Sequence, residues 1–367
     1  TSIGITGMYQ TNQNKAKEVL IPAYKLFDIG GFVFTQYSKN KLNISGGVRY
    51  DTRHDAGDPL EEDGEIKFAA FTKTFSDISG SVGLSYEVSK ALALKANLAR
   101  GFRAPNFAEL ASNGAHEGTN RYEIGNNDLK SEVSLQGDAG VELTTEHVSL
   151  DASLFYNHIN NFIFYERLQN QAGSDSVLTD PESGQSLDVY KFDQHTANLY
   201  GAEFSLDIHP HPLDWLHFKN VFSYTRGQFT ETIGGSDNIP FIPAARLFTS
   251  LGGDFFKKGT TLRNFYIGVE SDYVFRQDHP FTGFNTETNT PAYWLIGANA
   301  SVDFVRKGNT IATLSITGEN LGNIAYQNSL SRFKYLDVNN ATGRQGVYNV
   351  GRNIGIKLNV PLNFKYN

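Results

Sequence analysis

The sequence of 367 residues contains no cysteine, which excludes a disulfide framework, a thiolate nucleophile and a zinc–thiolate site. No apolar run approaches the ~18 residues that a membrane-spanning helix requires. The formal net charge is −7, so the chain lacks the basic surface that nucleic acids bind, and no nucleic-acid partner is expected. The G-x-S-x-G, P-loop and H-E-x-x-H patterns are absent as well, and we therefore expect a protein that is not an enzyme.

The sequence does contain regular alternation of apolar and polar residues. In Tyr200–Ile208, Trp294–Phe304 and Ile354–Val360, every second residue is apolar and those between them are mostly polar or glycine. A period of two predicts β-strands that each have one wetted face. The mean hydropathy of −0.36 would suit a soluble protein, but strands that present one face to lipid and one to water also give a polar average.

The connections between the predicted strands alternate between short and long along the whole chain. This alternation is typical of transmembrane barrels, which have tight periplasmic turns and long outer loops. It predicts an all-β fold, a transmembrane antiparallel β-barrel, with about fourteen strands in this chain and Val347–Pro361 as the last. A soluble β-sandwich would also bury aromatic residues, but it does not explain the alternating connection lengths. The short connections are Ser38–Lys41, Ser89–Lys90, Thr145–His147, His209–Leu213, Lys257–Gly259 and Arg306–Asn309, and the long ones are Thr11–Ala23, His54–Phe75, Arg103–Ser131, Asn170–Leu187, Glu231–Ile242, Gln277–Pro291 and Gly322–Gly346.

The long connection Arg103–Ser131 carries the most specific local pattern. The alternating strand before it is stopped near Pro105, because proline cannot donate to a ladder and disfavours helical geometry in the preceding residue. Asn106 and Glu109 have the spacing of an N-cap pair, which predicts one short helical turn over Phe107–Leu110. A connection this long between neighbouring strands is usually functional.

Several spaced motifs stand in this connection and near the C-terminus. They are Gly101–Asn106 with Glu109–Leu110, His116–Thr119, Arg121–Glu123, Gly125–Asn126 with Leu129–Glu132, Gly318–Asn323 and Gly351–Gly355. In this order they resemble the motifs of TonB-dependent outer-membrane receptors. The resemblance covers most of the chain and is specific for the family, though not for any substrate.

The resemblance implies a 22-stranded barrel with a plugged lumen, in which the plug precedes the barrel. Nothing in the chain resembles a plug or a TonB box, so residues 1–367 are expected to be the C-terminal portion of the barrel region, with no plug domain. Thr1–Thr6 already has the pattern of a strand and shows no basic start or cleavage site, which predicts a mature or truncated chain. The implied location is the outer membrane of a Gram-negative bacterium, with lipid and lipopolysaccharide, TonB through the missing plug, and a small-molecule or metal-chelate ligand as partners.

Four loop residues are candidate metal ligands. His116 and Glu117 lie in the central long connection, and Asp278 and His279 lie in a later one. Imidazole with carboxylate suits zinc or a similar ion, and the four would converge if both loops closed over one mouth. The alternative is that each is an ordinary exposed loop residue. No resident cofactor is expected, and a metal ion or chelate would be the transported ligand.

His209 and His211 alternate with prolines in a predicted short turn. Their spacing would allow weak chelation of a metal. The structural interpretation is a rigid periplasmic turn, which the two prolines favour.

Arginine side chains predict a cationic mouth. Arg103 at a strand end would attract an anionic ligand or a plug carboxylate, or would form a structural pair with Glu109 or Glu123. Arg121 is the second candidate for ligand binding. Further arginines of the same predicted mouth are Arg100, Arg332 and Arg344.

Aromatic side chains in the predicted outer loops suit a bulky apolar chelate. Tyr122, Phe281 and Phe284 are the candidates for such a rim. The alternative, which is the commoner use of loop aromatics, is that they pack the loops on one another.

Three functions remain open from the sequence. The resemblance implies high-affinity uptake of a scarce, bulky nutrient through the outer membrane, with TonB-derived energy. A ferric siderophore is the most frequent cargo of the family, and zinc, haem, cobalamin and oligosaccharides are alternatives. A complete, passive fourteen-stranded channel and a barrel-based adhesin or hydrolase are the rival classes.

Overall fold

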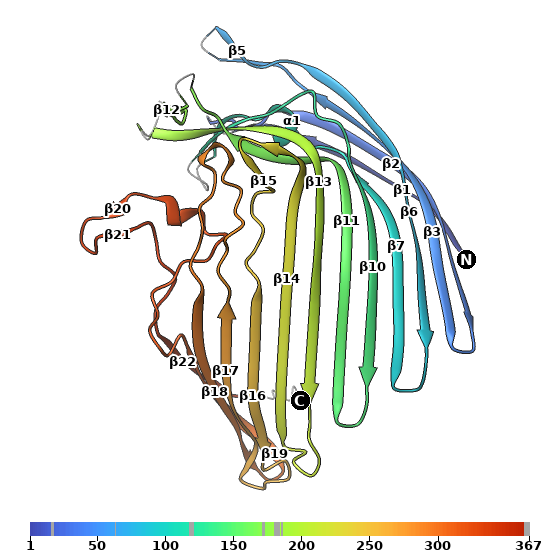
Figure 1. The fold of residues 1–367 in the computed structure, drawn as a ribbon, viewed down its shortest axis with the longest axis vertical. Helices are drawn as coiled ribbons and strands as arrows, with labels where there is room; N and C mark the ends of the chain where they lie inside the picture. Colours follow the sequence, from blue (N-terminus) through green and yellow to red (C-terminus); the bar gives the residue numbers. More distant parts are fainter. Residues whose placement is uncertain are drawn as a thin grey trace, which may run out of the picture.

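The computed structural model of the protein describes residues 1–15, 18–62, 64–116, 121–170, 173–179, 184 and 186–362. In this part of the chain, fourteen long strands form one curved antiparallel sheet (Figure 1). They are β1 (Ser2–Asn12), β2 (Tyr24–Lys39), β3 (Leu42–Gly57), β6 (Phe71–Glu87), β7 (Leu92–Arg103), β10 (Glu132–Thr144), β11 (Val148–Arg167), β13 (Ser186–Ile208), β14 (Leu216–Ile233), β16 (Arg246–Phe255), β17 (Leu262–Val274), β18 (Tyr293–Arg306), β19 (Asn309–Glu319) and β22 (Asn353–Asn359). The predicted fold class and strand number are therefore confirmed.

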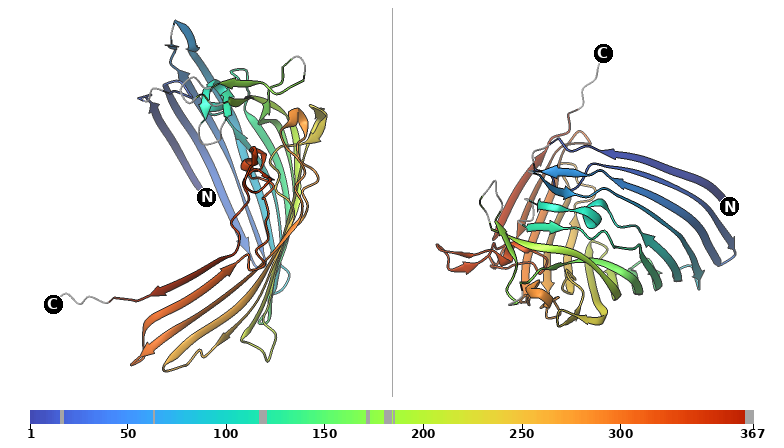
Figure 2. Two further views of the ribbon diagram at one scale, coloured as in Figure 1. Left: turned by 90° about the vertical axis from the view of Figure 1, so that its left-hand side faces the viewer. Right: turned by 90° about the horizontal axis from the view of Figure 1, so that it is seen from above.

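Each long strand pairs with the next one along the chain, from β1 to β22, so the sheet is a meander. Seen from above, the strands follow an arc with β1 and β22 at its two edges (Figure 2). Within the described residues, the outer edges of these two strands have no partner strand. The ladder has a bulge in β11 between Ile159 and Phe162, where two residues have no partner in β13, and one of the same size in β17 between Arg263 and Tyr266.

Shorter elements lie where the long connections are. They are β4 (Leu60–Glu62), β5 (Glu65–Phe68), α1 (Phe107–Ala111), β8 (Asn113–His116), β9 (Arg121–Ile124), β12 (Val177–Thr179), β15 (Ser236–Asn238), η2 (Gly283–Asn285), η3 (Arg332–Tyr335), β20 (Val338–Asn339) and β21 (Arg344–Gln345). We call this end of the sheet the loop end and the opposite end the short-turn end. The described part of the chain has no helix long and apolar enough to cross a membrane.

The registers separate an apolar face of the sheet from a polar one. Leu154, Ala202 and Tyr224 lie side by side on the apolar face, and the adjacent row on the other face contains Ser153 and Glu203. Because side chains alternate along a strand, one register fixes the same division for the whole sheet. Exposed apolar residues on this face include Ile5, Val33, Val48, Val82, Leu98, Leu135, Val269, Ile316 and Ile356.

Two predicted boundaries were wrong. The last strand begins at Asn353 rather than Val347, because the preceding backbone bonds to the loop before it: Val347 N donates to Phe333 O at 2.9 Å and Asn349 N to Tyr326 O at 3.0 Å. The predicted loop His54–Phe75 is shorter than expected, because β3 and β6 stay paired as far as Gly57.

The predicted helical turn is present as α1, with one more residue than expected. Asn106 Oδ1 accepts a hydrogen bond from Glu109 N at 2.9 Å, and Glu109 Oε2 accepts one from Asn106 N at 2.8 Å. This reciprocal pair is a capping box, which satisfies backbone donors at the start of the helix. The ring of Phe107 stacks on that of Tyr24 with centroids 3.7 Å apart.

Two apolar clusters hold the loop end together, and both include residues from loops and from strands. The first contains Phe75, Ala104, Leu110, Leu129 and Ile163. The second contains Phe164, Ala197, Phe229, Ile233, Ile239 and Phe281. The loop end is thus packed, and its side chains have fixed positions from which a site can be built.

The two faces of the sheet predict opposite responses to charge. Leu154 is 63% exposed on the apolar face of β11, so Leu154→Arg in lipid vesicles is expected to lower the free energy of unfolding by about 2–4 kcal/mol. The matched control is Ser153→Arg, whose side chain lies on the polar face opposite Glu203 and is expected to cost less than about 1 kcal/mol. Denaturant titration monitored by tryptophan emission measures both, and equal losses would contradict the assignment of the faces.

Candidate ligand-binding site at the loop end

Two arginine side chains from different loops meet over the same tyrosine ring. The Cζ atom of Arg121 lies 4.1 Å from the ring centroid of Tyr165, and that of Arg332 lies 4.9 Å from it. Arg332 also lies 4.6 Å from the ring centroid of Phe241, and Arg121 lies 5.6 Å from that of Tyr190. We call these five residues the Arg121–Arg332 cluster.

Non-local pairing places Arg121 in this cluster. The short strand β9 pairs antiparallel with β8 and parallel with β13, and this second pairing sets Arg121 opposite Asp188 and Glu123 opposite Tyr190. Figure 1 shows β13 curving over at the loop end, and β9 pairs with its residues Asp188–Lys191. Tyr165 follows the bulge in β11 and faces Phe192 in the register with β13.

Arg332 and Phe241 come from two other loops. Arg332 opens η3, in the connection between β19 and β22. Phe241 lies between β15 and β16 with a φ of 62°, a left-handed conformation that is uncommon for a bulky residue and marks a constrained backbone. Three connections far apart in the sequence therefore supply side chains to one place.

The charge of Arg121 is only partly balanced. Glu123 Oε1 lies 2.5 Å from both Nε and Nη2 of Arg121, and the same oxygen lies 2.8 Å from His116 Nδ1. Arg121 and Glu123 are both buried. The remaining nitrogen of Arg121, Nη1, is buried and donates no hydrogen bond to any described residue.

The charge of Arg332 has no acidic partner in the described chain, where its side chain contacts aromatic rings and forms no ion pair. Burial, together with the nearby positive charge of Arg121, lowers the pKa of Arg332 to about 10. A pKa of about 10 still leaves the guanidinium charged at neutral pH. The cluster thus holds two cations against the single carboxylate of Glu123.

Nearby carboxylates do not compensate for this excess. Asp175 and Asp188 both bind Arg167, which lies 2.8 Å from Asp175 through Nη1 and contacts Asp188 through Nη2. The hydroxyl of Tyr165 is buried and also has no hydrogen-bond partner among the described residues. Unsatisfied buried donors cost free energy, so two guanidinium groups and a phenol here favour an acceptor-rich, anionic ligand with a flat face.

Arg103 lies elsewhere and is already paired. Its Nη1 donates to Glu109 Oε1 and Oε2 at 2.9 and 2.7 Å, and its Nη2 lies 3.1 Å from Glu132 Oε2. The structural pair with Glu109 is therefore present and the one with Glu123 is not. Its predicted role in ligand binding stays a prediction.

The predicted aromatic rim lies within packed structure. Phe281 has no exposed surface, and its ring contacts those of Phe164 and Phe229 with centroids 5.9 and 5.8 Å away. Phe284 packs against Phe281 at 6.3 Å. The hydroxyl of Tyr122 donates to Asn113 Oδ1 at 2.7 Å. These contacts are those of loop packing, and the ligand-binding prediction for the three residues remains untested.

The predicted metal ligands are not gathered by the described structure. His116 pairs with Glu123, whereas His279 Nε2 lies 3.5 Å from its neighbour Asp278. Among the described residues, the one set of three potential ligands within 4.8 Å of one another contains neither pair. Glu117 lies outside the described residues, so the four-residue metal site stays a prediction.

A recess lies on the polar face between β1 and β7. It has a volume of about 570 Å³ and is lined by charged residues. Arg53 Nε and Nη2 donate to the two oxygens of Asp28 at 2.8 and 2.9 Å, and Arg49 Nε donates to Asp51 Oδ2 at 2.6 Å. Since these guanidinium groups have carboxylate partners, this recess offers less to an anion than the Arg121–Arg332 cluster.

Sequence reasoning named Arg121 and Arg332 but missed their three aromatic neighbours. Tyr165 and Tyr190 lie in long alternating strands, and Phe241 lies in a polar loop. The alternation shows which residues share a face of one strand, but it does not show which loop will cover that face.

Comparison with known proteins finds one matching family and several similar solved structures. Residues 6–321 match the family "TonB dependent receptor-like, beta-barrel". The solved structure of the copper transporter OprC superposes with a TM-score of 0.70 at 16% identity, covering 91% of this chain and 48% of that one. The ferric yersiniabactin uptake receptor FyuA from Yersinia pestis gives 0.63 at 16% identity, covering 98% and 47%. The FrpB iron transporter from Neisseria meningitidis (F5-1 variant) gives 0.62 at 13% identity, covering 93% and 46%. The chain thus spans about half the length of these structures.

The pairing of Glu109 predicts how firmly the central loop is anchored. Glu109→Ala removes both the capping bond and the ion pair with Arg103, each a hydrogen bond to a charged group worth about 1.5–3 kcal/mol. Tryptic cleavage after Arg121 or Lys130 is expected to become at least about tenfold faster, because proteolysis follows the population of the opened loop. Glu109→Gln retains the capping bond and is expected to fall between Ala and the wild type.

Glu65→Ala, at an exposed position in another loop, is the control for this experiment. Its cleavage pattern should match that of the wild type. An unchanged rate in Glu109→Ala would show that the pair does not hold the loop.

Proposed function

Because the chain belongs to the TonB-dependent receptor family, whose members lie in the outer membrane of Gram-negative bacteria, we propose that it captures an anionic metal chelate and imports it. The Arg121–Arg332 cluster is the proposed point of capture, and a ferric siderophore is the proposed cargo class. Residues 1–367 supply barrel wall and outer loops. Coupling to TonB belongs to the plug domain that the family implies.

The observation that carries this proposal is the excess of donors over acceptors in the cluster. Among the described residues, Arg332 has aromatic neighbours and no carboxylate partner, Nη1 of Arg121 is buried without an acceptor, and the buried hydroxyl of Tyr165 has no hydrogen-bond partner. An anionic chelate with planar aromatic or carboxylate arms supplies acceptors to all three and stacks against the rings. The partial burial of Arg332, which lowers its pKa, strengthens any such bond.

The orientation follows from the connection lengths. The long connections gather at the loop end, and in transmembrane barrels such loops face the outside while tight turns face the periplasm. The polar face of the sheet would then line the lumen and the apolar face would meet lipid, with lipopolysaccharide around the outer half. Figure 2 shows the loop-end elements β9 and α1 lying within the arc, where an incoming ligand would pass.

Structural neighbours support the cargo class. They include a copper transporter, an iron transporter and a ferric yersiniabactin uptake receptor, and a ferric-catecholate import receptor from E. coli also superposes, with a TM-score of 0.60. Because the identities are low, the superpositions show a shared fold and no more. The choice of an anionic chelate for this chain rests on its own arginines.

Replacing Arg332 tests the proposal. Arg332→Gln is expected to weaken binding of an anionic ferric tris-catecholate chelate by about 10- to 100-fold, the value of one hydrogen bond to a charged group. Binding of an uncharged ferric tris-hydroxamate chelate should change much less. Titration of the full-length protein in detergent, followed by tryptophan quenching, measures both affinities.

Arg344→Gln is the matched control, because Arg344 lies in the same connection and also stacks on an aromatic ring, with Cζ 5.1 Å from the centroid of Tyr348. Its affinities should equal those of the wild type. Equal losses in the two variants, or binding of the uncharged chelate alone, would contradict capture of an anion at the cluster.

Glu123 predicts the opposite effect. Glu123→Gln keeps an acceptor for Arg121 but removes the single negative charge in the cluster. Affinity for the anionic chelate is therefore expected to rise by about tenfold, equal to about 1.4 kcal/mol. The same titration at two salt concentrations measures it, and a fall in affinity would show that Glu123 is needed to position Arg121 rather than opposing the ligand.

A further inference from the structure

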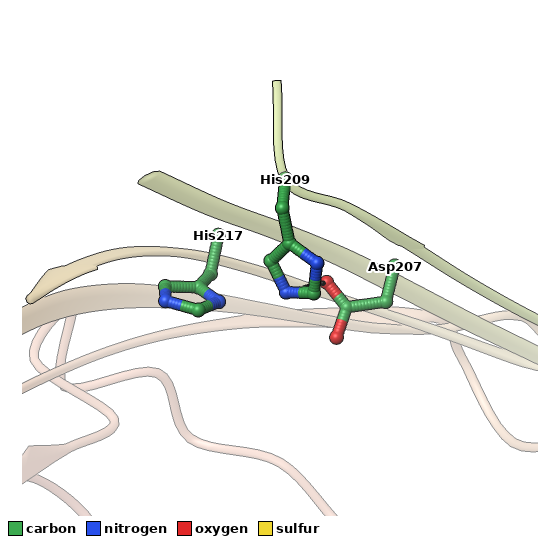
Figure 3. Close-up of side chains that lie close together, drawn as sticks. All are labelled: Asp207, His209 and His217. Carbon is green, nitrogen blue, oxygen red and sulfur yellow. Dashed lines mark ion pairs between the residues drawn. The ribbon is translucent and has the colours of Figure 1, made fainter. Parts of the chain in front are cut away.

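The short-turn end carries a second cluster, which consists of imidazole and carboxylate groups. It lies at the opposite end of the sheet from the Arg121–Arg332 cluster. Asp207 lies near the end of β13, His209 follows in the turn, and His217 lies near the start of β14. Asp254 is near the end of β16. Figure 3 shows the first three side chains converging from the two strands and the turn between them.

Strand register brings these residues to one face. Asp207 continues the polar row that contains Glu203, His217 pairs with Gly252 in β16, and Asp254 follows two residues after Gly252. The three side chains therefore point to the polar, concave side of the sheet. His209 reaches the same place from the turn, beside His217, and the centroids of the two imidazole rings are 4.6 Å apart.

The geometry of the set is that of metal ligands. One potential ligand atom from each of Asp207, His209 and His217 lies within 4.8 Å of the other two, and no other such set of three is found in the described chain. Asp207 Oδ1 and His209 Nε2 are 3.3 Å apart. Two ligands on a tetrahedral ion with bonds of about 2.0–2.1 Å lie about 3.3 Å apart.

An unsatisfied oxygen points to a missing partner. Asp207 Oδ1 is buried and accepts no hydrogen bond from the described residues, although His209 Nε2 is close. A buried carboxylate oxygen without a donor costs free energy. A cation at this point would satisfy it.

Asp254 supplies the usual support of a metal-bound imidazole. Its Oδ2 lies 3.0 Å from His217 Nε2, which leaves Nδ1 as the free nitrogen of that ring. Figure 3 shows a nitrogen of His217 directed towards His209 and Asp207. Carboxylates that hold the second nitrogen of a metal-binding histidine fix its tautomer and orientation. Lys257 Nζ lies 4.0 Å from Asp254 Oδ2, so this cation pairs with the outer carboxylate.

We propose that Asp207, His209 and His217 form a binding site for a divalent transition-metal ion at the short-turn end, with Asp254 orienting His217. Two imidazoles and a carboxylate without thiolate suit zinc, and also cobalt, nickel or copper in the divalent state. A fourth position remains for water or another ligand. The site rests on its own geometry and is independent of anion capture at the loop end.

Cobalt(II) is a direct probe, because tetrahedral cobalt absorbs visible light and zinc does not. The full-length protein, without a histidine tag and stripped of metal by chelator, should develop this absorption with one equivalent of cobalt and lose it when zinc is added. His217→Ala is expected to abolish the absorption at that concentration. Asp254→Asn is expected to weaken cobalt binding by about 10- to 100-fold, the usual effect of losing an orienting partner.

His211→Ala is the matched control. His211 lies in the same turn but pairs with Asp214 at 3.4 Å and is well exposed, so its replacement should leave cobalt binding unchanged. His209→Ala removes a ligand without touching a strand, and it decides the matter if His217→Ala fails to show heat-modifiable migration. Absence of the spectrum in the wild type, or its persistence in His209→Ala, would mean that the cluster is only a set of histidine–carboxylate pairs.

Discussion

Backbone hydrogen bonding in lipid is the constraint from which the rest of this structure follows. A chain that crosses the hydrocarbon must pair every N–H and C=O group within protein, and a sheet does this only through continuous ladders. The long strands satisfy that demand with registers that run almost without interruption from β1 to β22. The ladder in turn fixes the two faces, because one residue of slip would turn the apolar residues of a strand towards the lumen. The same constraint requires partners for the outer edges of β1 and β22 in a membrane.

At the loop end the chain satisfies its polar groups in other ways than through a continuous ladder of strands. The loop end packs around two apolar clusters, and its polar groups are satisfied by local devices such as the capping box of α1 and the ion pair between Arg103 and Glu109. Arg121, Arg332 and Tyr165 depart from this pattern, since donors stay unused beside them in the described structure. In a region where most other donors are satisfied, an excess of unsatisfied donors is typical of a ligand-binding site.

Features set by neighbouring residues could be predicted from the sequence, whereas features set by distant pairing could not. Alternation predicted the faces of β13, β18 and β22, and the spacing of Asn106 and Glu109 predicted α1, because both signals act over a few residues. The parallel pairing of β9 with β13 joins segments more than sixty residues apart, and no local sequence pattern predicts this pairing. In the sequence, Phe281 is an aromatic residue of a polar loop, yet residues from β11, β13, β14 and one other loop bury it. From the sequence, His209 was predicted to chelate a metal only weakly. Its partners His217 and Asp254 lie in strands whose register cannot be read from the sequence.

Contact between the apolar face and lipid is the central claim, and the two tryptophans of the chain report on this contact directly. Trp294 lies on the apolar face at the loop end of β18, is 57% exposed, and donates from Nε1 to Ser271 Oγ at 2.8 Å. Trp215 lies at the short-turn end and packs on Phe255 with ring centroids 5.1 Å apart. The decisive measurement is quenching of tryptophan emission by brominated lipids in vesicles, made on Trp215→Phe so that Trp294 alone is observed. If the apolar face meets lipid, lipids brominated near the interface should quench the emission of Trp294 strongly, and aqueous iodide should quench it weakly. Strong quenching by iodide with none by brominated lipid would place this face in water and contradict its contact with lipid.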